Sequence, residues 1–195
     1  PWGVEFLAMF HMSNDSYLFR GAPGPGLAPL YEGKMVQAFD HRAASVETIA
    51  RNLKRPGQPR ETRLEEHEDP RYSPKPQYWV ERNLARSLMT EGSCLIAFKS
   101  VTSPTNERTV ISALLPFTGV ANSMIVVTTG THRLDLDTAF LATLNSLVLD
   151  YVAKQKVGGV NLNFFLVYQF PVIPPHAYKV VDLDFIVPRV LELTY

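Results

Sequence analysis

The fold is decided by residues 140–175, which read FLATLNSLVLDYVAKQKVGGVNLNFFLVYQFPVIPP. Apolar residues recur here at the i, i+3, i+4 spacing of an amphipathic helix, which predicts a helix over residues 137–154. A glycine pair ends this helix. The apolar run at residues 164–170 is predicted to be a buried strand that stops at two prolines. The segment contains no catalytic motif and is typical of a scaffold that presents amides and cations, as surfaces that bind nucleic acid do.

The rest of the chain is richer in strand signals than in helix signals. After residue 92, runs enriched in Val, Ile and Thr are separated by polar or glycine-containing turns. Strands are predicted over residues 34–39, 94–101, 109–115 and 123–129, and helices over residues 43–53, residues 80–89 and from Phe185 onwards, with Pro188 in the first turn of the last. Strands and helices do not alternate regularly. The predicted fold is therefore α+β, with a mixed β-sheet core and flanking helices.

The 195 residues suffice for one sizeable core. Residues 54–76 are charged, rich in proline and poor in large aliphatic side chains, which predicts an exposed loop excursion. Cys94 is the only cysteine, which argues against a disulfide framework and a zinc knuckle. The sequence shows no signal peptide and no apolar run long enough to span a bilayer, and both of its ends look cut. We therefore expect a piece of a longer cytoplasmic protein that has no membrane partner.

Positive and negative charges balance over the whole chain but not along it. Residues 151–179 carry three lysines and no acidic residue, and residues 92–134 carry three cationic residues against Glu107 alone. The acidic residues gather elsewhere, notably at residues 61–69. A neutral chain with cationic stretches of this kind can present a phosphate-binding face.

Familiar catalytic patterns are missing from the sequence. Binding of S-adenosylmethionine requires a glycine-rich turn between a strand and a helix, and the Gly-Pro-Gly step at residues 24–26 lacks both neighbours. Amino-methylating enzymes need Asn or Asp beside Pro-Pro-aromatic, whereas Ile173 precedes the Pro-Pro step here. There is no P-loop, no His-Glu-x-x-His helix and no Gly-x-Ser-x-Gly elbow. The chain alone is predicted to be non-catalytic and to hold no cofactor or metal ion.

Polar residues at the ends of predicted strands are candidate DNA contacts. His41 stands between Asp40 and Arg42. This pattern fits a base or phosphate contact, and equally a surface cluster in which Asp40 pairs with Arg42. Asn106 and Arg108 lie in a polar turn that leads into a strand. Arg reads guanine bidentately and Asn reads adenine, so the turn suits base contact as well as ordinary turn chemistry.

Four further candidates lie around the predicted helix end. Lys154 and Lys156 can contact phosphates, although cations at a helix C-terminus also simply complement the helix dipole. Asn161 and Asn163 flank an apolar residue and either bond loop backbone or meet a ligand. These groups recur at the ends of rigid elements, where an edge that faces a DNA groove would lie.

Three strings carry a family resemblance: LYEGKMVQAFDHR (residues 30–42), SPTNERTVISALLP (residues 103–116) and LNSLVLDYVAKQKVGGVNLNFFLVYQFPVIPP (residues 144–175). They resemble the C-terminal target-recognition region of large adenine-N6 DNA methyltransferases. These are the type IIG restriction–modification enzymes and the methylases of BREX-like phage-defence systems. The third string also resembles TaqI-like specificity domains. The resemblance covers most of the chain and is weakest over residues 43–76.

The resemblance implies a division of labour within a site-specific parent enzyme. A methyltransferase domain, covalently linked on the N-terminal side, would bind S-adenosylmethionine and methylate an adenine flipped out of the duplex. Residues 1–29, with the linker-like string MFHMSNDSYLFR, would lead out of that domain, and residues 30–195 would form the target-recognition domain that reads double-stranded DNA. Residues 51–63 would be among the loops that choose the sequence. The family positions are Lys34, Gln37, Asp40, His41, Arg42, Asn106, Arg108, Lys154, Lys156, Asn161 and Asn163.

Two alternatives from other classes stay open. Glu32-Gly33-Lys34 matches the Glu-x-Lys half of a Mg²⁺-dependent nuclease site, with Asp15 as the second carboxylate, although no Pro-Asp precedes it. The other alternative is a protein-interaction module that docks partner subunits of a defence complex.

Overall fold

The computed structural model describes residues 1–49, 57–89 and 95–194. Its centre is an antiparallel four-stranded sheet with the order β1 (Glu5–Leu7), β9 (Met124–Thr128), β6 (Leu95–Lys99) and β7 (Ser112–Leu115). A second sheet has the order β5 (Tyr78–Glu81), β2 (Leu27–Tyr31) and β8 (Gly119–Val120), and β2 runs parallel to β8. The strands β3 (Ala44–Thr48) and β4 (Gly57–Glu61) pair separately. The predicted α+β class with mixed sheets is confirmed.

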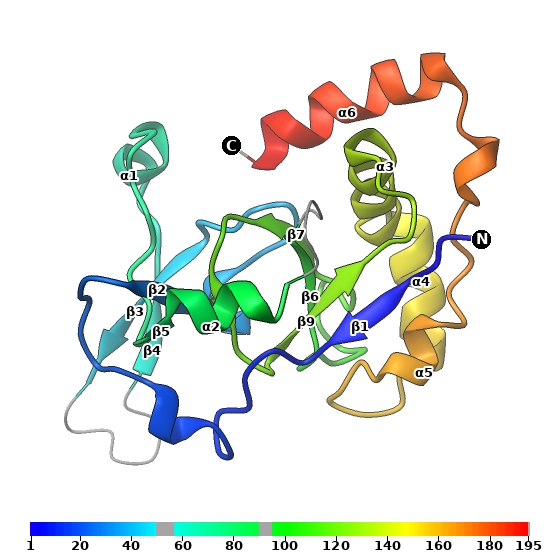
Figure 1. Ribbon diagram of the computed structural model, residues 1–195. Helices are drawn as coiled ribbons and strands as arrows, with labels where there is room; N and C mark the ends of the chain where they lie inside the picture. The colour runs from blue at the N-terminus through cyan, green and yellow to red at the C-terminus, as the bar shows by residue number, and fades with distance from the viewer. Residues whose placement is uncertain (50–56, 90–94, 195) are drawn as a thin grey trace.

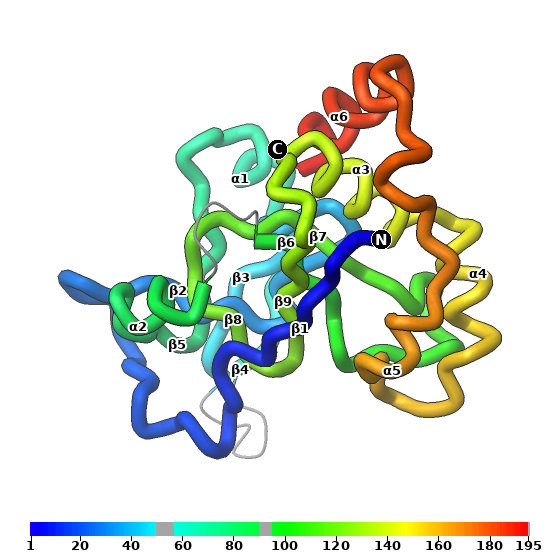
Figure 2. The backbone as a smooth tube through the Cα atoms, turned by 45° about the vertical axis from the view of Figure 1, so that its right-hand side comes forward, coloured from blue at the N-terminus to red at the C-terminus, as the bar shows by residue number. Residues whose placement is uncertain are grey.

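The four helices after residue 133 cover one side of the central sheet, whereas the helix that follows β5 packs in the core on the other side. The helices are α1 (Leu64–Glu68), α2 (Arg82–Ser87), α3 (Leu134–Leu144), α4 (Leu147–Lys156), α5 (Phe164–Val167) and α6 (Val180–Thr194), with 3-10 turns η1 (Ser16–Leu18), η2 (Gly33–Met35) and η3 (Pro175–Ala177). Figure 1 shows α3, α4 and α5 to the right of the sheet, α6 lying across α3, and α1 standing apart at the upper left. Figure 2 gives the same arrangement turned by 45° about the vertical axis. Among the described residues, no single helix is long and apolar enough to cross a membrane.

The central sheet separates two hydrophobic cores, because alternate side chains of a strand point to opposite faces. In β6, Ile96 and Phe98 enter the core under α3, α4 and α6, whereas Leu95 and Ala97 enter the core shared with β2, β5 and β8. The three Val-, Ile- and Thr-rich runs were therefore predicted correctly as strands β6, β7 and β9. Their almost continuous apolar runs are what a sheet buried on both faces requires.

The helical layer is fastened to the sheet by two buried polar side chains, Asn145 and Asp150. Asn145 Oδ1 accepts hydrogen bonds from the backbone N and the Oγ of Ser112, both at 3.0 Å, and Nδ2 donates to the Ser112 carbonyl at 2.8 Å. Asp150 Oδ1 accepts from the backbone N of Thr109 and of Val110, both at 2.8 Å. The chain that leads into β7 thus has its backbone groups satisfied by the helices.

The single helix predicted over residues 137–154 is wrong, because two helices meet there at a bend of 57°. Asn145 uses its side chain on Ser112 rather than facing solvent, and Ser146 caps α4 by accepting from Leu149 N at 3.2 Å. Local side-chain hydrogen bonds compete with the helical backbone at such residues. Apolar periodicity continues across the bend and so concealed it.

The strand predicted over residues 164–170 is also wrong, since α5 begins at Phe164. A strand would bury every second residue, but the buried residues are Val167 and Phe170, three positions apart, with Leu166 half-buried beside them. Helical spacing therefore matches the core that this segment meets. The aromatic and β-branched composition gave a β signal that tertiary packing overrode.

Three predictions in the first half of the chain also change. Residues 34–39 form η2 and an extended passage rather than a strand, and Phe39 takes a left-handed φ of 66° where it bridges Ala113. The helix predicted over residues 43–53 is strand β3 in its described part, because it pairs with β4. In the excursion at residues 54–76, half of the residues from 57 onwards are exposed, and the segment contains β4 and α1.

The C-terminal helix begins earlier than predicted, at Val180, and carries Pro188 in its interior. Proline removes one helical hydrogen bond there. Burial of Leu183 and Val190, with Ile186 and Val187 packed against the same core, keeps the helix on α3. The predicted helix N-terminus at Phe185 had relied on the preference of proline for a first turn.

We expect Asn145→Ala to lower the free energy of unfolding by about 3 kcal/mol, because it leaves buried donors and an acceptor of Ser112 without partners. Urea denaturation followed by circular dichroism measures the change. Asn83→Ala, at an exposed position of α2, is the matched control and should cost less than about 0.5 kcal/mol. Equal stability of the two variants would contradict the proposed fastening.

Candidate nucleic-acid interface

One end of the central sheet collects most of the predicted contact residues. Lys99, at the end of β6, pairs with Met124, at the start of β9. Ser112, at the start of β7, lies opposite Phe98. The segments that leave β6 and enter β7 and β9 therefore share one end of the sheet, which we call the β6 rim: residues 99–110, Asn122 and Ser123. Asn161 joins it through a bridge to Val101.

An open depression of about 520 Å³ lies at the β6 rim, and we call it the asparagine depression. It is lined by Ala8, His11, Ser100, Asn122, Ile125, Asn161, Leu162, Asn163, Phe164 and Phe165. Its walls come from the segment after β1, the end of β6, the turn before β9 and the start of α5. The candidate residues Asn161 and Asn163 thus line the same depression.

The three amides of this depression differ in what they bind. Asn122 Oδ1 accepts from the Met12 backbone N at 3.3 Å, and Asn122 Nδ2 lies 3.4 Å from His11 Nδ1. The side chains of Asn161 and Asn163 are exposed and make no hydrogen bond with any residue that the structure describes. Two amide groups are therefore available to a ligand, while the third supports the wall.

A second depression, of about 320 Å³, adjoins the first at the β6 rim, and we call it the lysine depression. It is lined by Glu32, Gly33, Lys34, Lys99, Val101 and Ser123. Lys34 Nζ pairs with Glu32 Oε2 at 3.0 Å and also donates to the Gly57 carbonyl. In the described chain, no carboxylate pairs with Lys99, and burial lowers the pKa of its ammonium group.

Arg108 and Lys154, both predicted contacts, surround the buried carboxylate of Asp150. Lys154 Nζ lies 3.6 Å from Asp150 Oδ2 and donates to the Glu107 carbonyl at 2.7 Å. Arg108 Nε lies 3.9 Å from the same oxygen, and its Nη2 donates to the Asn145 carbonyl. Their charges compensate the carboxylate of Asp150, so they attract a phosphate group less strongly than unpaired cations would.

Lys156, in contrast, lies close to the asparagine depression and has a neutral partner. Its Nζ donates to Gln169 Oε1 at 3.3 Å, and Gln169 Nε2 donates to the Phe165 carbonyl at 2.9 Å. Since Phe165 lines the depression, this chain of bonds places Lys156 beyond the α5 wall. Asn106 is exposed in the loop of the β6 rim.

The remaining predicted residues lie in the segment between η2 and β3. Arg42 is buried and donates to the carbonyls of His67 and Asp69 at 3.0 and 3.2 Å. His41 is half-buried, and burial is the main cause that lowers its pKa. Gln37 is exposed in a turn. The structure therefore does not bring Gln37, His41 and Arg42 to the two depressions.

The residues of the nuclease alternative are not gathered around one point. Glu32 and Lys34 pair with each other, whereas Asp15 accepts from the His11 backbone N at 2.7 Å and does not line the lysine depression. Within the described ranges, no group of three His, Cys, Asp or Glu residues could hold a metal ion. Cys94 lies outside those ranges.

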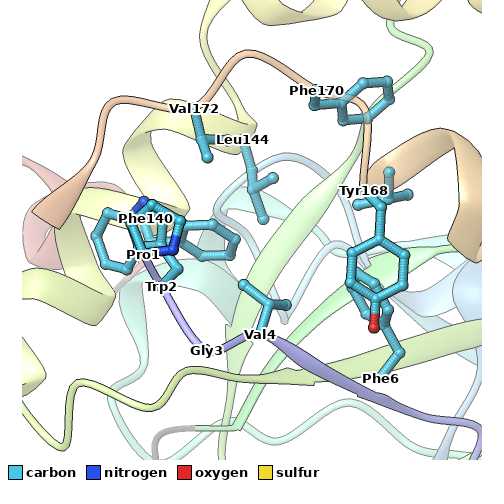
Figure 3. Close-up of a pocket in the computed structure, with 11 residues that line it drawn as sticks. Pro1, Trp2, Gly3, Val4, Phe6, Phe140, Leu144, Tyr168, Phe170 and Val172 are labelled. Atoms are coloured by element: carbon cyan, nitrogen blue, oxygen red, sulfur yellow. The ribbon is translucent and has the colours of Figure 1, made fainter.

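An apolar pocket of about 260 Å³ lies between β1, α3 and the segment that follows α5 (Figure 3). Trp2, Phe140, Leu144, Phe170 and Val172 supply most of its wall. The Trp2 indole N–H is committed to the Ile173 carbonyl at 2.8 Å. This pocket brings together none of the predicted contact residues, so we do not assign it to the interface.

Sequence reasoning missed Lys99 and Phe165 as individual candidates. Lys99 was visible only as one charge in a cationic stretch, and its position at the end of a predicted strand was the available signal. Phe165 was assigned to a buried strand, so its exposure of 61% was not expected. Comparison with protein-family models, curated proteins and solved structures finds no match for this chain.

The exposed excursion holds an ion-pair cluster centred on Arg60. Its guanidinium donates to both carboxylate oxygens of Glu66 at 2.8 Å, and its Nε lies 3.0 Å from Glu47. Of the loop expected to choose the DNA sequence, residues 51–63, only residues 57–63 are described. Arg60 in that part is already paired. Its hydrogen bonds lower the pKa of Glu66 from 4.5 to about 2.

A carboxyl group with a lowered pKa stabilises the folded state above its unfolded pKa and loses that contribution as the pH falls through its folded pKa. We therefore expect the contact between β4 and α1 to weaken as the pH falls from about 4.5 towards 2. Carboxyl carbon NMR titration should place Glu66 below the other glutamates, and Arg60→Gln should return its pKa towards the ordinary value. Arg71→Gln, which removes an exposed partner of Asp69, should leave Glu66 unchanged.

Proposed function

We propose that this chain binds double-stranded DNA and is the target-recognition domain of an adenine-N6 DNA methyltransferase that acts in restriction–modification or phage defence. The observation that carries the proposal is the setting of Lys99 and Lys156. No carboxylate pairs with either lysine among the described residues. Lys99 lines the lysine depression, and Lys156 is linked through Gln169 to Phe165 of the asparagine depression, which offers two unbonded amides.

Electrostatics favours an anionic polymer at this place. A partly buried lysine without a carboxylate is costly, and a phosphate group would relieve that cost. Lys99 lines the lysine depression, one residue before Ser100 of the asparagine depression, and Lys156 lies beyond Phe165 on the α5 wall. Phosphate contacts from these lysines would position a duplex over the depression, where side chains that read bases are needed.

The sequence resemblance supplies the finer part of the proposal. The strings at residues 30–42, 103–116 and 144–175 form the η2 passage, the β6 rim with β7, and the α4–α5 wall. In the parent enzyme, a linked N-terminal domain would bind S-adenosylmethionine and transfer the methyl group, and the whole enzyme would work in the cytoplasm on cellular or phage DNA. This chain would supply affinity and sequence choice.

We expect Lys99→Gln combined with Lys156→Gln to weaken binding to every duplex alike and to reduce the slope of log K against log[salt] by about 2, since each phosphate contact contributes about 0.9. Fluorescence anisotropy with labelled duplexes, from 50 to 200 mM salt as a range of about fourfold, measures both effects. Lys179→Gln, at an exposed site before α6, is the matched control.

An unchanged slope would remove the two lysines from the interface. Absence of binding by the unmodified chain at the lowest salt would overturn the proposal as a whole. Methyl transfer by the chain alone, with S-adenosylmethionine and duplex supplied, would contradict its non-catalytic role.

A further inference from the structure

Asn163 occupies a position where its side chain would ordinarily hydrogen-bond to the backbone of the chain itself. It is the N-cap residue of α5, and an Asn at this position normally accepts a hydrogen bond from the first turn. Here the side chain makes no capping bond, is exposed and lines the asparagine depression. Its amide therefore presents a donor and an acceptor, neither of them hydrogen-bonded within the described chain, at the start of α5.

Phe165 stands on the same short helix and contrasts with its neighbour. Phe164 stacks on Phe6, with ring centroids 5.4 Å apart and planes 11° apart, so its ring has a partner. Phe165 is 61% exposed and lines the depression without a ring partner among the described residues. The Gln169 side chain holds its carbonyl at 2.9 Å. The Phe165 ring and the unbonded Asn163 amide therefore line the same depression.

We propose that Asn163 and Phe165 together read an A·T base pair through the major groove, an inference that rests on the DNA-binding function proposed above. Adenine presents the N7 acceptor and the N6 amino donor side by side, which an asparagine amide matches with two hydrogen bonds. Thymine presents a methyl group that a phenylalanine ring can contact. Guanine presents two acceptors, so the amide oxygen would face the guanine O6 and lose one bond.

The first test selects bound duplexes from a randomised library and compares the preferred sequences. The unmodified chain should show a strong A·T preference at one position, and Asn163→Ala should lose about 5- to 150-fold of that preference at that position alone. The slope of affinity against salt should not change, because the amide carries no charge. Asn83→Ala, at an exposed amide of α2, should keep the full preference.

The second test changes individual base atoms of the DNA as well as side chains of the protein. Replacing the selected adenine by 7-deazaadenine removes N7, and replacing its thymine partner by uracil removes the methyl group. The unmodified chain should bind both analogues more weakly. Asn163→Ala should become insensitive to 7-deazaadenine and Phe165→Ala insensitive to uracil, while each stays sensitive to the other change.

The outcomes separate this inference from the proposed function. Duplex binding with the same selected sequence in Asn163→Ala, or with equal sensitivity to both analogues in every variant, overturns the A·T assignment and leaves DNA binding in place. Failure of the unmodified chain to bind any duplex overturns both.

Discussion

The structure depends on the two buried polar side chains at the bend between α3 and α4. Asn145 and Asp150 satisfy the backbone of the segment that leads into β7, so the helices and the central sheet cannot move independently without leaving buried groups unbonded. An apolar contact alone would allow sliding between these layers. Directional hydrogen bonds fix their relative position, and with it the place of the β6 rim beside α4 and α5.

The same constraint divides the cations of the chain into two groups. The buried carboxylate of Asp150 requires compensation, and Arg108 and Lys154 provide it. Lys34 likewise forms an ion pair with Glu32 and so compensates its charge. Among the described cations near the two depressions, Lys99 and Lys156 have no carboxylate partner: Lys99 lines the lysine depression, and Lys156 lies beyond the α5 wall of the asparagine depression. The proposed interface is thus smaller than the list of positive residues, and its affinity for DNA would rest on few charges and on neutral amides.

Local patterns predicted some elements well and failed at others for identifiable reasons. The strands β6, β7 and β9 and the helix α2 were predicted, since their composition and their packing point the same way. Residues 164–170 failed because their β-favouring side chains meet a core that accepts helical spacing. The bend at Asn145 was hidden because apolar periodicity continues through it. Near the candidate site, Asn161, Asn163 and Lys156 had been candidates from the sequence, whereas Lys99 and Phe165 had not been singled out.

The sequence by itself determined the α+β class, three of the four strands of the central sheet and the kinds of group available for binding, because these follow from side-chain chemistry and short-range periodicity. Only the tertiary structure decided which of those groups remain free. A lysine or an amide has the same chemistry whether it meets solvent or a buried carboxylate, and its partner comes from a distant part of the chain. Asp150 lies 42 residues after Arg108 and only 3.9 Å from its guanidinium nitrogen Nε, a fact that no local pattern contains.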